Sequence, residues 1–210
     1  MPTAVSARVM PASQRSVPVY DESARRIADL YESTTFEVVH AGSLDLLPPA
    51  EAAVLDVGAG SGRDASALAT RGYCVTAVEP SRGLREEAQV RHRGANIEWL
   101  DDALPTLRSL DERQFALILV SAVWMHLAPR DRPKAMRRLG QLLEPGGRLV
   151  VSIRQGPADP SRSIVTVTSR AVEASAIRAG LRVIRRLEAP DALERANIAW
   201  STLVLEKPAS

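Results

Sequence analysis

Val-Leu-Asp-Val-Gly-Ala-Gly-Ser-Gly-Arg occupies positions 54–63 of this 210-residue chain. Residues 53–57 are a short apolar run, which is typical of a strand buried in a parallel sheet. Three glycines then stand at alternate positions, where glycine can take positive φ angles and lets another molecule approach the backbone. Residues 64–71 have apolar side chains at helical spacing and end at Gly72. The order strand, glycine turn, helix predicts a ligand crevice at the carboxyl end of a strand.

An acidic residue completes the expected ligand site. Glu79 closes a second apolar run, residues 73–78, and follows Gly58 by 21 positions. An acidic residue about 20 positions after such a turn accepts hydrogen bonds from the hydroxyls of a ribose, so the ligand is expected to be a nucleoside. The dinucleotide pattern G-x-G-x-x-G would need a small residue at position 63, where this chain has Arg63. The pattern here is G-x-G-x-G instead.

The run from Asp56 to Gly62, followed by Glu79, resembles the first two motifs of the class I S-adenosylmethionine-dependent methyltransferases. The resemblance covers about residues 20–208. It implies an α/β, Rossmann-like three-layer sandwich with a seven-stranded, mostly parallel sheet in the order 3-2-1-4-5-7-6, strand 7 antiparallel. The alternation of strands and helices can be read from the chain itself.

The resemblance also implies a cofactor, S-adenosyl-L-methionine, with S-adenosyl-L-homocysteine as its product. Cofactor contacts are then expected from the glycine turn and from the end of the second strand: Asp56, Gly58, Ala59, Gly60, Ser61, Gly62, Arg63, Glu79 and Pro80.

Two further strand ends are expected to face the cofactor. The third strand, residues 97–100, leads into Asp101, Asp102 and Ala103. In the resembled family an Asp here accepts a hydrogen bond from the adenine amine, and Asp102 matches that pattern better than Asp101. The alternative is a turn carboxylate without a ligand. The fourth strand, residues 115–121, leads from Ser121 into Ala122 and Val123, a position that faces the methyl group in the family.

The domain organisation follows from the composition of the chain and from the spacing of its apolar residues. Residues 1–19 mix Pro, Ser, Ala, Gln and Arg and are expected to be a flexible leader. A single domain, residues 20–208, consists of a helical cover over 20–47 and a Rossmann-like core over 52–208. Tyr20 and Tyr31 in the cover either touch the cofactor, as the resemblance implies, or pack against the domain.

Composition limits where the protein is expected to be located and which partners it is expected to bind. The chain is 45% apolar and 25% charged with a net charge of +2, so nothing strongly favours nucleic acid or membrane as a partner. It has one cysteine, Cys74, expected to be buried in the second strand, and a reducing, cytoplasmic location is predicted. No apolar run approaches the roughly 20 residues of a membrane helix. The three histidines show no metal spacing, so no metal is predicted.

Methyl transfer from a sulfonium needs a nucleophile held in line with the leaving sulfur, and a base only if the nucleophile carries a proton. His126, beyond the fourth strand, is a candidate base, although a structural role is as plausible. Arg154 closes the fifth strand and is a candidate for positioning the acceptor. With neighbouring residues at the same sheet edge it would suit an anionic acceptor. Those neighbours are Gln155, Arg162, Asp191, Arg195 and Trp200.

The sequence therefore predicts an S-adenosylmethionine-dependent methyltransferase acting on an oxygen or nitrogen of a small molecule, as a monomer or homodimer. The alternative is a regulatory or partner protein that binds S-adenosylmethionine or S-adenosylhomocysteine without catalysis. Transfer to tRNA, rRNA or protein is disfavoured by the near-balanced charge and by Ser121-Ala-Val-Trp124 in place of an Asn-Pro-Pro-Tyr-like tetrad. A nicotinamide-dependent reductase is disfavoured by Arg63 and by the lack of a Tyr-x-x-x-Lys pair.

Overall fold

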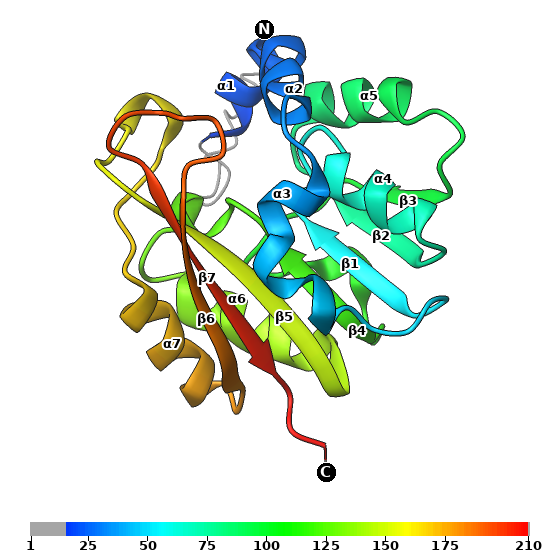
Figure 1. Cartoon of the computed structure of the whole chain (residues 1–210), viewed down its shortest axis with the longest axis vertical. Coiled ribbons are helices and arrows are strands. Elements are labelled where there is room, and N and C mark those ends of the chain that lie inside the picture. The colour runs from blue at the N-terminus through cyan, green and yellow to red at the C-terminus, as the bar shows by residue number, and fades with distance from the viewer. Residues whose placement is uncertain (1–15, 210) are drawn as a thin grey trace, which may run out of the picture.

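A seven-stranded sheet forms the centre of the protein, and its strand order is β3-β2-β1-β4-β5-β7-β6 (Figure 1). The computed structural model describes residues 16–209 of the chain. β7 runs antiparallel to both β5 and β6, while the other neighbouring strands are parallel. The predicted fold class and strand order are therefore confirmed. The strands are β1 (Ala53–Val57), β2 (Cys74–Val78), β3 (Ile97–Leu100), β4 (Phe115–Val120), β5 (Leu143–Gln155), β6 (Arg182–Pro190) and β7 (Ala199–Glu206).

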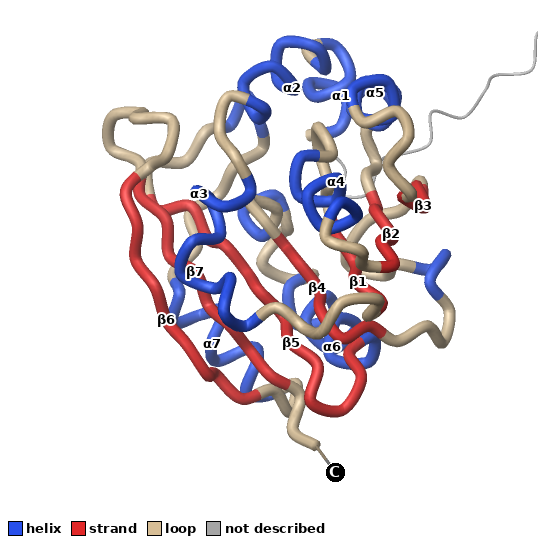
Figure 2. The backbone as a smooth tube through the Cα atoms, turned by 45° about the vertical axis from the view of Figure 1, so that its right-hand side comes forward, coloured by secondary structure: helices blue, strands red, loops and turns tan. Residues whose placement is uncertain are grey.

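Helices cover both faces of this sheet (Figures 1 and 2). The α-helices are α1 (Val17–Glu22), α2 (Ala24–Glu32), α3 (Phe36–His40), α4 (Arg63–Thr70), α5 (Arg82–Arg91), α6 (Arg132–Leu142) and α7 (Ser169–Arg178). Short 3₁₀-helices are η2 (Ala41–Leu46), η3 (Arg108–Leu110), η4 (Trp124–His126) and η5 (Pro160–Arg162). In Figure 1, α3 and α4 lie in front of the sheet and α6 lies behind it.

The two faces bury separate apolar cores, because strands in a parallel sheet point alternate side chains to opposite sides. One core packs Leu55, Ile118 and Val151 against α6 and α7. The other packs Val54 and Leu117 against α3, η2 and α4. This burial fixes the sheet, and with it the line along which the carboxyl ends of β1, β2 and β4 meet.

The N-terminal helices dock on the start of α5. Asp21 Oδ1 accepts hydrogen bonds from Ser81 Oγ at 2.6 Å and from the Gly83 amide at 2.9 Å. A Cβ on Gly83 would lie 2.9 Å from Ala24 Cβ, so glycine is what allows α2 to approach this closely. The cover is thus attached beside the residues that follow β2.

The structure differs from the sequence predictions at a few positions. α1 begins at Val17, before the predicted end of the leader at residue 19, and the leader's residues 1–15 lie outside the described residues. Cys74 is exposed rather than buried, because it is the first residue of β2 and lies at the strand's amino end. Of the helices described, none is long and apolar enough to cross a membrane.

Candidate active site

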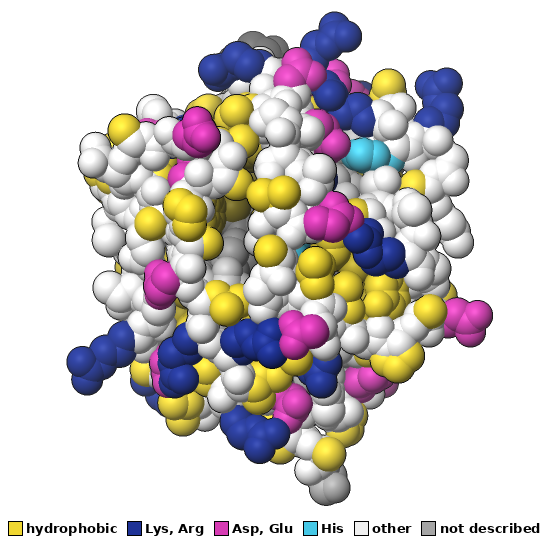
Figure 3. All heavy atoms as spheres, in the orientation of Figure 1, with side chains coloured by type: hydrophobic (Ala, Val, Ile, Leu, Met, Phe, Trp, Pro, Cys, Tyr) yellow, Lys and Arg dark blue, Asp and Glu magenta, His cyan; other side chains and the backbone are white. Residues whose placement is uncertain are grey.

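A cavity of about 230 Å³ opens where the carboxyl ends of β1, β2 and β4 meet. Figure 3 shows a hollow on this face of the molecule, between α3 and the connection from β6 to β7. Most of the predicted cofactor-binding residues line the cavity: Tyr20, Tyr31, Asp56, Gly58, Ala59, Gly60, Ser61, Arg63, Glu79, Pro80, Asp102, Ala103, Ser121, Ala122 and Val123. Gly62 and Asp101 do not line it.

The glycine turn follows β1 directly and has a conformation that only glycine adopts easily. Gly58 and Gly60 have φ angles of +73° and +56°. The Gly58 amide donates to the Val78 carbonyl at 2.7 Å, which ties the turn to the end of β2. A Cβ on Gly58 would lie 2.4 Å from Val123 Cγ2, and a Cβ on Gly60 would lie 3.3 Å from the Tyr31 ring. The turn is therefore a cradle that side chains on these glycines would fill.

Glu79 lies buried under this cradle. Its Oε2 accepts from the Gly60 amide at 2.9 Å and its Oε1 accepts from the Ser81 amide at 2.8 Å. Burial raises the pKa of the Glu79 carboxyl to about 7, although these two bonds oppose the rise. A carboxylate has about four lone-pair sites, so each oxygen keeps one for a ligand hydroxyl. This geometry suits a ribose.

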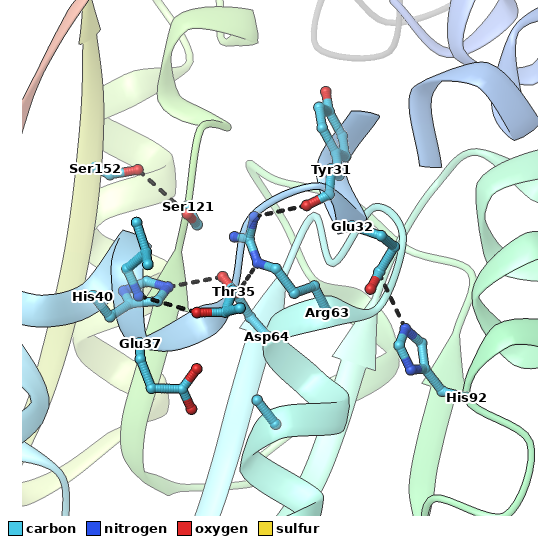
Figure 4. A network of polar contacts seen from close by, with 12 residues as sticks. Tyr31, Glu32, Thr35, Glu37, His40, Arg63, Asp64, His92, Ser121 and Ser152 are labelled. Carbon is cyan, nitrogen blue, oxygen red and sulfur yellow. Dashed lines mark hydrogen bonds and ion pairs between the residues drawn. The ribbon is translucent and has the colours of Figure 1, made fainter. Parts of the chain in front are cut away.

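A buried ionic network lies under the start of α4 (Figure 4). Asp64 Oδ2 is 2.8 Å from His40 Nε2, and Asp64 Oδ1 accepts from Arg63 Nε at 2.7 Å. Burial alone would raise the pKa of the Asp64 carboxyl. The positive charges of His40 and Arg63, and the hydrogen bonds that both residues make to Asp64, outweigh burial and hold this pKa below its usual range. Arg63 also donates to the Tyr31 carbonyl at 3.2 Å. The network thus joins the glycine turn to α2 and α3.

The pKa of Asp56 is shifted in the opposite direction. Burial, followed by the negative charge of Asp64, raises the pKa of the Asp56 carboxyl well above its ordinary value. Its Oδ2 is buried and has no hydrogen-bond partner among the described residues. An orphaned carboxyl oxygen facing a cavity indicates a place for a ligand donor or cation.

The structure separates the two acidic residues after β3. Asp102 lines the cavity, and its Oδ2 accepts from the amide and hydroxyl of Ser109 at 2.7 and 2.8 Å. Asp101 is exposed and pairs with Arg85 at 2.9 Å. Only Asp102 is therefore placed to meet a ligand, and its predicted bond to adenine stays a prediction.

The backbone after β4 is held in an unusual conformation. Ala122 has a φ angle of +58°, which costs energy for a residue with a side chain. The Ala122 amide donates to Ser152 Oγ of β5 at 2.9 Å, and Ser121 Oγ lies 3.4 Å from the same oxygen. Ser152 therefore anchors the turn that brings Ser121, Ala122 and Val123 to the cavity.

Two tyrosines, a histidine and an arginine meet at the cover. Arg162 donates to the Tyr20 hydroxyl at 3.0 Å and to the Tyr31 hydroxyl at 3.3 Å. The Tyr20 hydroxyl also lies 3.2 Å from His126 Nε2. Burial, and then the charge of Arg162, lowers the pKa of His126 to about 4, so its ring is neutral near pH 7. A nitrogen with such a low pKa is a weak base, and a hydrogen-bond acceptor for Tyr20 is its more direct role.

We expect His126 to make folding stability fall in acid. Its pKa is about 6.5 in the unfolded chain and about 4 when folded, so between these values the unfolded chain binds a proton that the folded protein excludes. Stability is fully present above about pH 6.5 and is lost, by up to about 3 kcal/mol, toward pH 4. Urea unfolding of the wild type and His126→Gln across this range measures the difference. Parallel curves for the two proteins would contradict the assigned shift.

The predicted acceptor-side residues divide into two groups. Asp191, Arg195 and Trp200 line the cavity together with His126. Arg154, Gln155 and Arg162 do not line it. Arg154 donates to the Pro157 carbonyl at 2.7 Å, within its own loop, so its predicted role in positioning an acceptor is not supported by a place in the cavity wall.

Sequence reasoning missed several residues of this site. His40 and Asp64 form the ionic network, Ser152 anchors the turn after β4, and Thr34, Val38 and Val39 add a wall. Asp64 had one usable signal, because an acidic residue in the first turn of a helix is favoured by the helix dipole. The others are distant in sequence from the motifs and carry no local signal.

No group of three or more His, Cys, Asp or Glu side chains suited to a metal ion occurs in residues 16–209. The sequence prediction that the protein uses no metal stays a prediction.

Comparison with known sequences gives one family and several relatives. Residues 54–147 match the model of a family described as a methyltransferase domain. An uncharacterised methyltransferase of Mycobacterium tuberculosis strain H37Rv is 37% identical over 106 residues, which are 50% of this chain and 52% of that protein. The chain thus spans about half the length of this relative.

Comparison with solved structures confirms the fold. The 1,6-didemethyltoxoflavin-N1-methyltransferase of Burkholderia thailandensis, solved with 1,6-didemethyltoxoflavin and S-adenosylhomocysteine bound, is 19% identical with a TM-score of 0.74. The alignment covers 97% of this chain and 93% of that one. The [4+2]-cyclase SpnF is 16% identical with a TM-score of 0.74, covering 97% of this chain and 98% of that one. The fold alone does not decide between such reactions.

Proposed function

We propose that this protein, whose residues 54–147 match a methyltransferase-domain family, is a class I S-adenosylmethionine-dependent methyltransferase that transfers a methyl group to an oxygen or nitrogen of a small molecule. The cofactor is S-adenosyl-L-methionine and the product is S-adenosyl-L-homocysteine. The observation that supports this most is Glu79, buried beneath a glycine cradle with one lone pair free on each carboxylate oxygen.

The residues present fit this cofactor. Glu79 would hold the ribose hydroxyls and Asp102 the adenine amine. Gly58 and Gly60 would let the amino-acid part of the cofactor lie against the backbone, since a Cβ at either position would meet a neighbouring side chain. The orphaned Oδ2 of Asp56 offers an acceptor in the same cavity. Tyr20 and Tyr31 close the cavity from the cover side.

When bound, the cofactor would supply an activated methyl group for attack by the acceptor's lone pair, with the sulfur as the leaving group. The chain's own residues hold the acceptor in line and exclude water. The acceptor's proton, where it has one, leaves to solvent or to a base. His126 lines the cavity, but with a pKa of about 4 and its Nε2 beside the Tyr20 hydroxyl it would be only a weak base; Arg154 would act only through its loop.

A small acceptor, with an anionic group as one option, is supported by the way the cavity is built. α1, α2 and α3 lie on one side of it, and the connection from β6 to β7 lies on another. A nucleic-acid acceptor would be favoured by a strongly basic surface, but the chain carries a net charge of only +2. The cytoplasmic location and the choice between monomer and homodimer stay predictions.

The test of this proposal is the fate of a labelled methyl group. Purified protein is incubated with methyl-labelled S-adenosylmethionine and a small-molecule extract, and the label is followed into small molecules, protein and RNA. We expect label in a small molecule with equimolar S-adenosylhomocysteine. Binding of S-adenosylhomocysteine without any transfer would favour the alternative of a non-catalytic regulatory or partner protein. Label in RNA or protein would contradict the proposed acceptor class.

A further inference from the structure

The part of the cavity beyond the cofactor residues has an apolar wall. It is contributed by α3 and by the connection between β6 and β7, and consists of Val38, Val39, Pro190, Ala192, Leu193 and Trp200. These segments border the hollow in Figure 3. Ligand sites of this kind bind an apolar body through contact area and use a few polar groups to orient it. The acceptor is therefore expected to have an apolar body.

The charges on this wall neutralise each other. Asp191 accepts hydrogen bonds from Arg195 Nε at 2.8 Å and Arg195 Nη2 at 2.7 Å. It also accepts from Trp200 Nε1 at 2.7 Å. These hydrogen bonds hold the pKa of the Asp191 carboxyl below its usual range, and the bond from Arg195 has the largest effect. The Asp191–Arg195 pair organises the loop and offers a ligand no net charge.

Arg162 has a different environment. Its guanidinium lies over the Tyr20 ring at 5.5 Å and bonds to the two tyrosine hydroxyls. Within residues 16–209 no carboxylate forms an ion pair with it. Asp159, three residues earlier, accepts instead from the hydroxyl and amide of Ser161 at 2.6 and 3.1 Å. The hydrogen-bond partners of the partly buried Arg162 are thus neutral groups, and Asp159 acts on its charge only at longer range.

The charges around Arg162 are mixed: Asp159 is negative and acts on it from beyond ion-pair distance, and Arg154 is positive. His126, beside Tyr20, is neutral near pH 7. The pKa of Arg154 is lowered by burial and then by the positive charges of Arg195 and Arg162. A partly buried cation that forms no ion pair stabilises an anion that arrives next to it, because the two charges interact in a medium less polar than water.

We propose that the acceptor is a small molecule with an apolar, aromatic-sized body and one carboxylate group, which binds where Arg162 meets Tyr20 and Tyr31. Tyr20 and Tyr31 line the cavity while Arg162 lies behind their hydroxyls. The Tyr20 O–H donates to His126, so the Tyr31 O–H, polarised by Arg162, is the donor that the carboxylate meets. This inference rests on the proposed function, since it assigns the acceptor for that same site. Arg162, rather than Arg154 or Arg195, is the residue that selects the anion.

The test is a binding measurement on protein saturated with S-adenosylhomocysteine, so that no methyl transfer occurs. Hydroxybenzoic and aminobenzoic acids are titrated calorimetrically, each beside its own carboxamide, which keeps the ring and removes the charge. We expect the acids that bind best to bind at least about tenfold tighter than their carboxamides, as one charge-assisted hydrogen bond implies. Arg162→Gln should reduce that preference to about twofold or less. Arg137→Gln, which removes the same charge from the exposed surface of α6, should leave it intact.

The other outcomes overturn the inference in distinguishable ways. If no acid is preferred over its carboxamide, or if Arg162→Gln keeps the preference, the acceptor class is wrong while the proposed function stands. If Arg162→Gln weakens S-adenosylhomocysteine itself, Arg162 binds the carboxylate of the cofactor and the inference is wrong. If the wild type does not bind S-adenosylhomocysteine at all, the proposed function fails and the inference fails with it.

Discussion

Glu79→Ala is expected to weaken the binding of S-adenosylhomocysteine by about a hundredfold or more. The substitution removes two charge-assisted hydrogen bonds to the ribose, each contributing about 1.5–3 kcal/mol. It also leaves the amides of Gly60 and Ser81 without the acceptor they now share. Isothermal calorimetry measures the affinity, and urea unfolding of the same variant measures how much of the loss is folding.

The pH dependence of binding separates the ribose contact from this structural role. Because burial raises the pKa of Glu79 to about 7, much of the carboxyl is protonated below neutrality. Ribose hydroxyls donate to the ionised form, so affinity should rise with pH and level off above about pH 7. One unit below the pKa it should be about tenfold weaker. Glu79→Gln should bind weakly with little dependence on pH.

The same experiment can contradict the assignment. A Glu79→Gln protein that binds S-adenosylhomocysteine as tightly as the wild type would exclude Glu79 as the ribose ligand. A wild-type affinity independent of pH between about 5.5 and 7.5 would mean that the ionised carboxyl is not what binds. His126, with a pKa of about 4, does not titrate in this window and is not a competing explanation.

Gly58→Ala is expected to cost both stability and ligand binding. Its φ angle of +73° costs a residue with a Cβ about 1–2 kcal/mol. The new methyl group would also lie 2.4 Å from Val123 Cγ2, and moving Val123 costs about 1–3 kcal/mol more. Val123 lines the cavity, so its displacement should weaken S-adenosylhomocysteine binding by at least about tenfold. Chemical unfolding and calorimetry measure the two effects.

Gly72→Ala is the matched control for this variant. Gly72 has a φ angle of +84°, but a Cβ there would meet nothing within 4 Å. It should therefore lose about 1–2 kcal/mol of stability from backbone strain alone and keep full ligand affinity. Equal losses of affinity in the two variants would mean that Gly58 acts only through stability and not as part of the cradle.

The topology was predictable because it follows from local patterns and a family resemblance. Each buried strand is a short apolar run, and the glycine turn after β1 fixes where the crevice lies. Positions at the ends of elements were less predictable. Cys74 begins β2 and is exposed, although the sequence predicted a buried position. Burial at an element's end depends on neighbours that a local pattern does not contain.

The cofactor side of the site was predictable for the same reason, since its residues follow strand ends within a few positions. The acceptor side depends on contacts between distant segments. Arg162 meets Tyr20 across 142 positions and His126 meets Tyr20 across 106. The sequence placed Arg154 and Arg162 at one sheet edge but could not show which of them faces the two tyrosines. His40 and Asp64 are likewise joined only by the fold.

The proposed nucleoside site is tested most directly by calorimetric titration of the wild-type protein with S-adenosylhomocysteine above the pKa of Glu79. We expect one site per chain with affinity in the micromolar range. A wild-type protein that is folded but shows no heat of binding would contradict it, because the glycine cradle, Glu79 and Asp102 would then not form a nucleoside site.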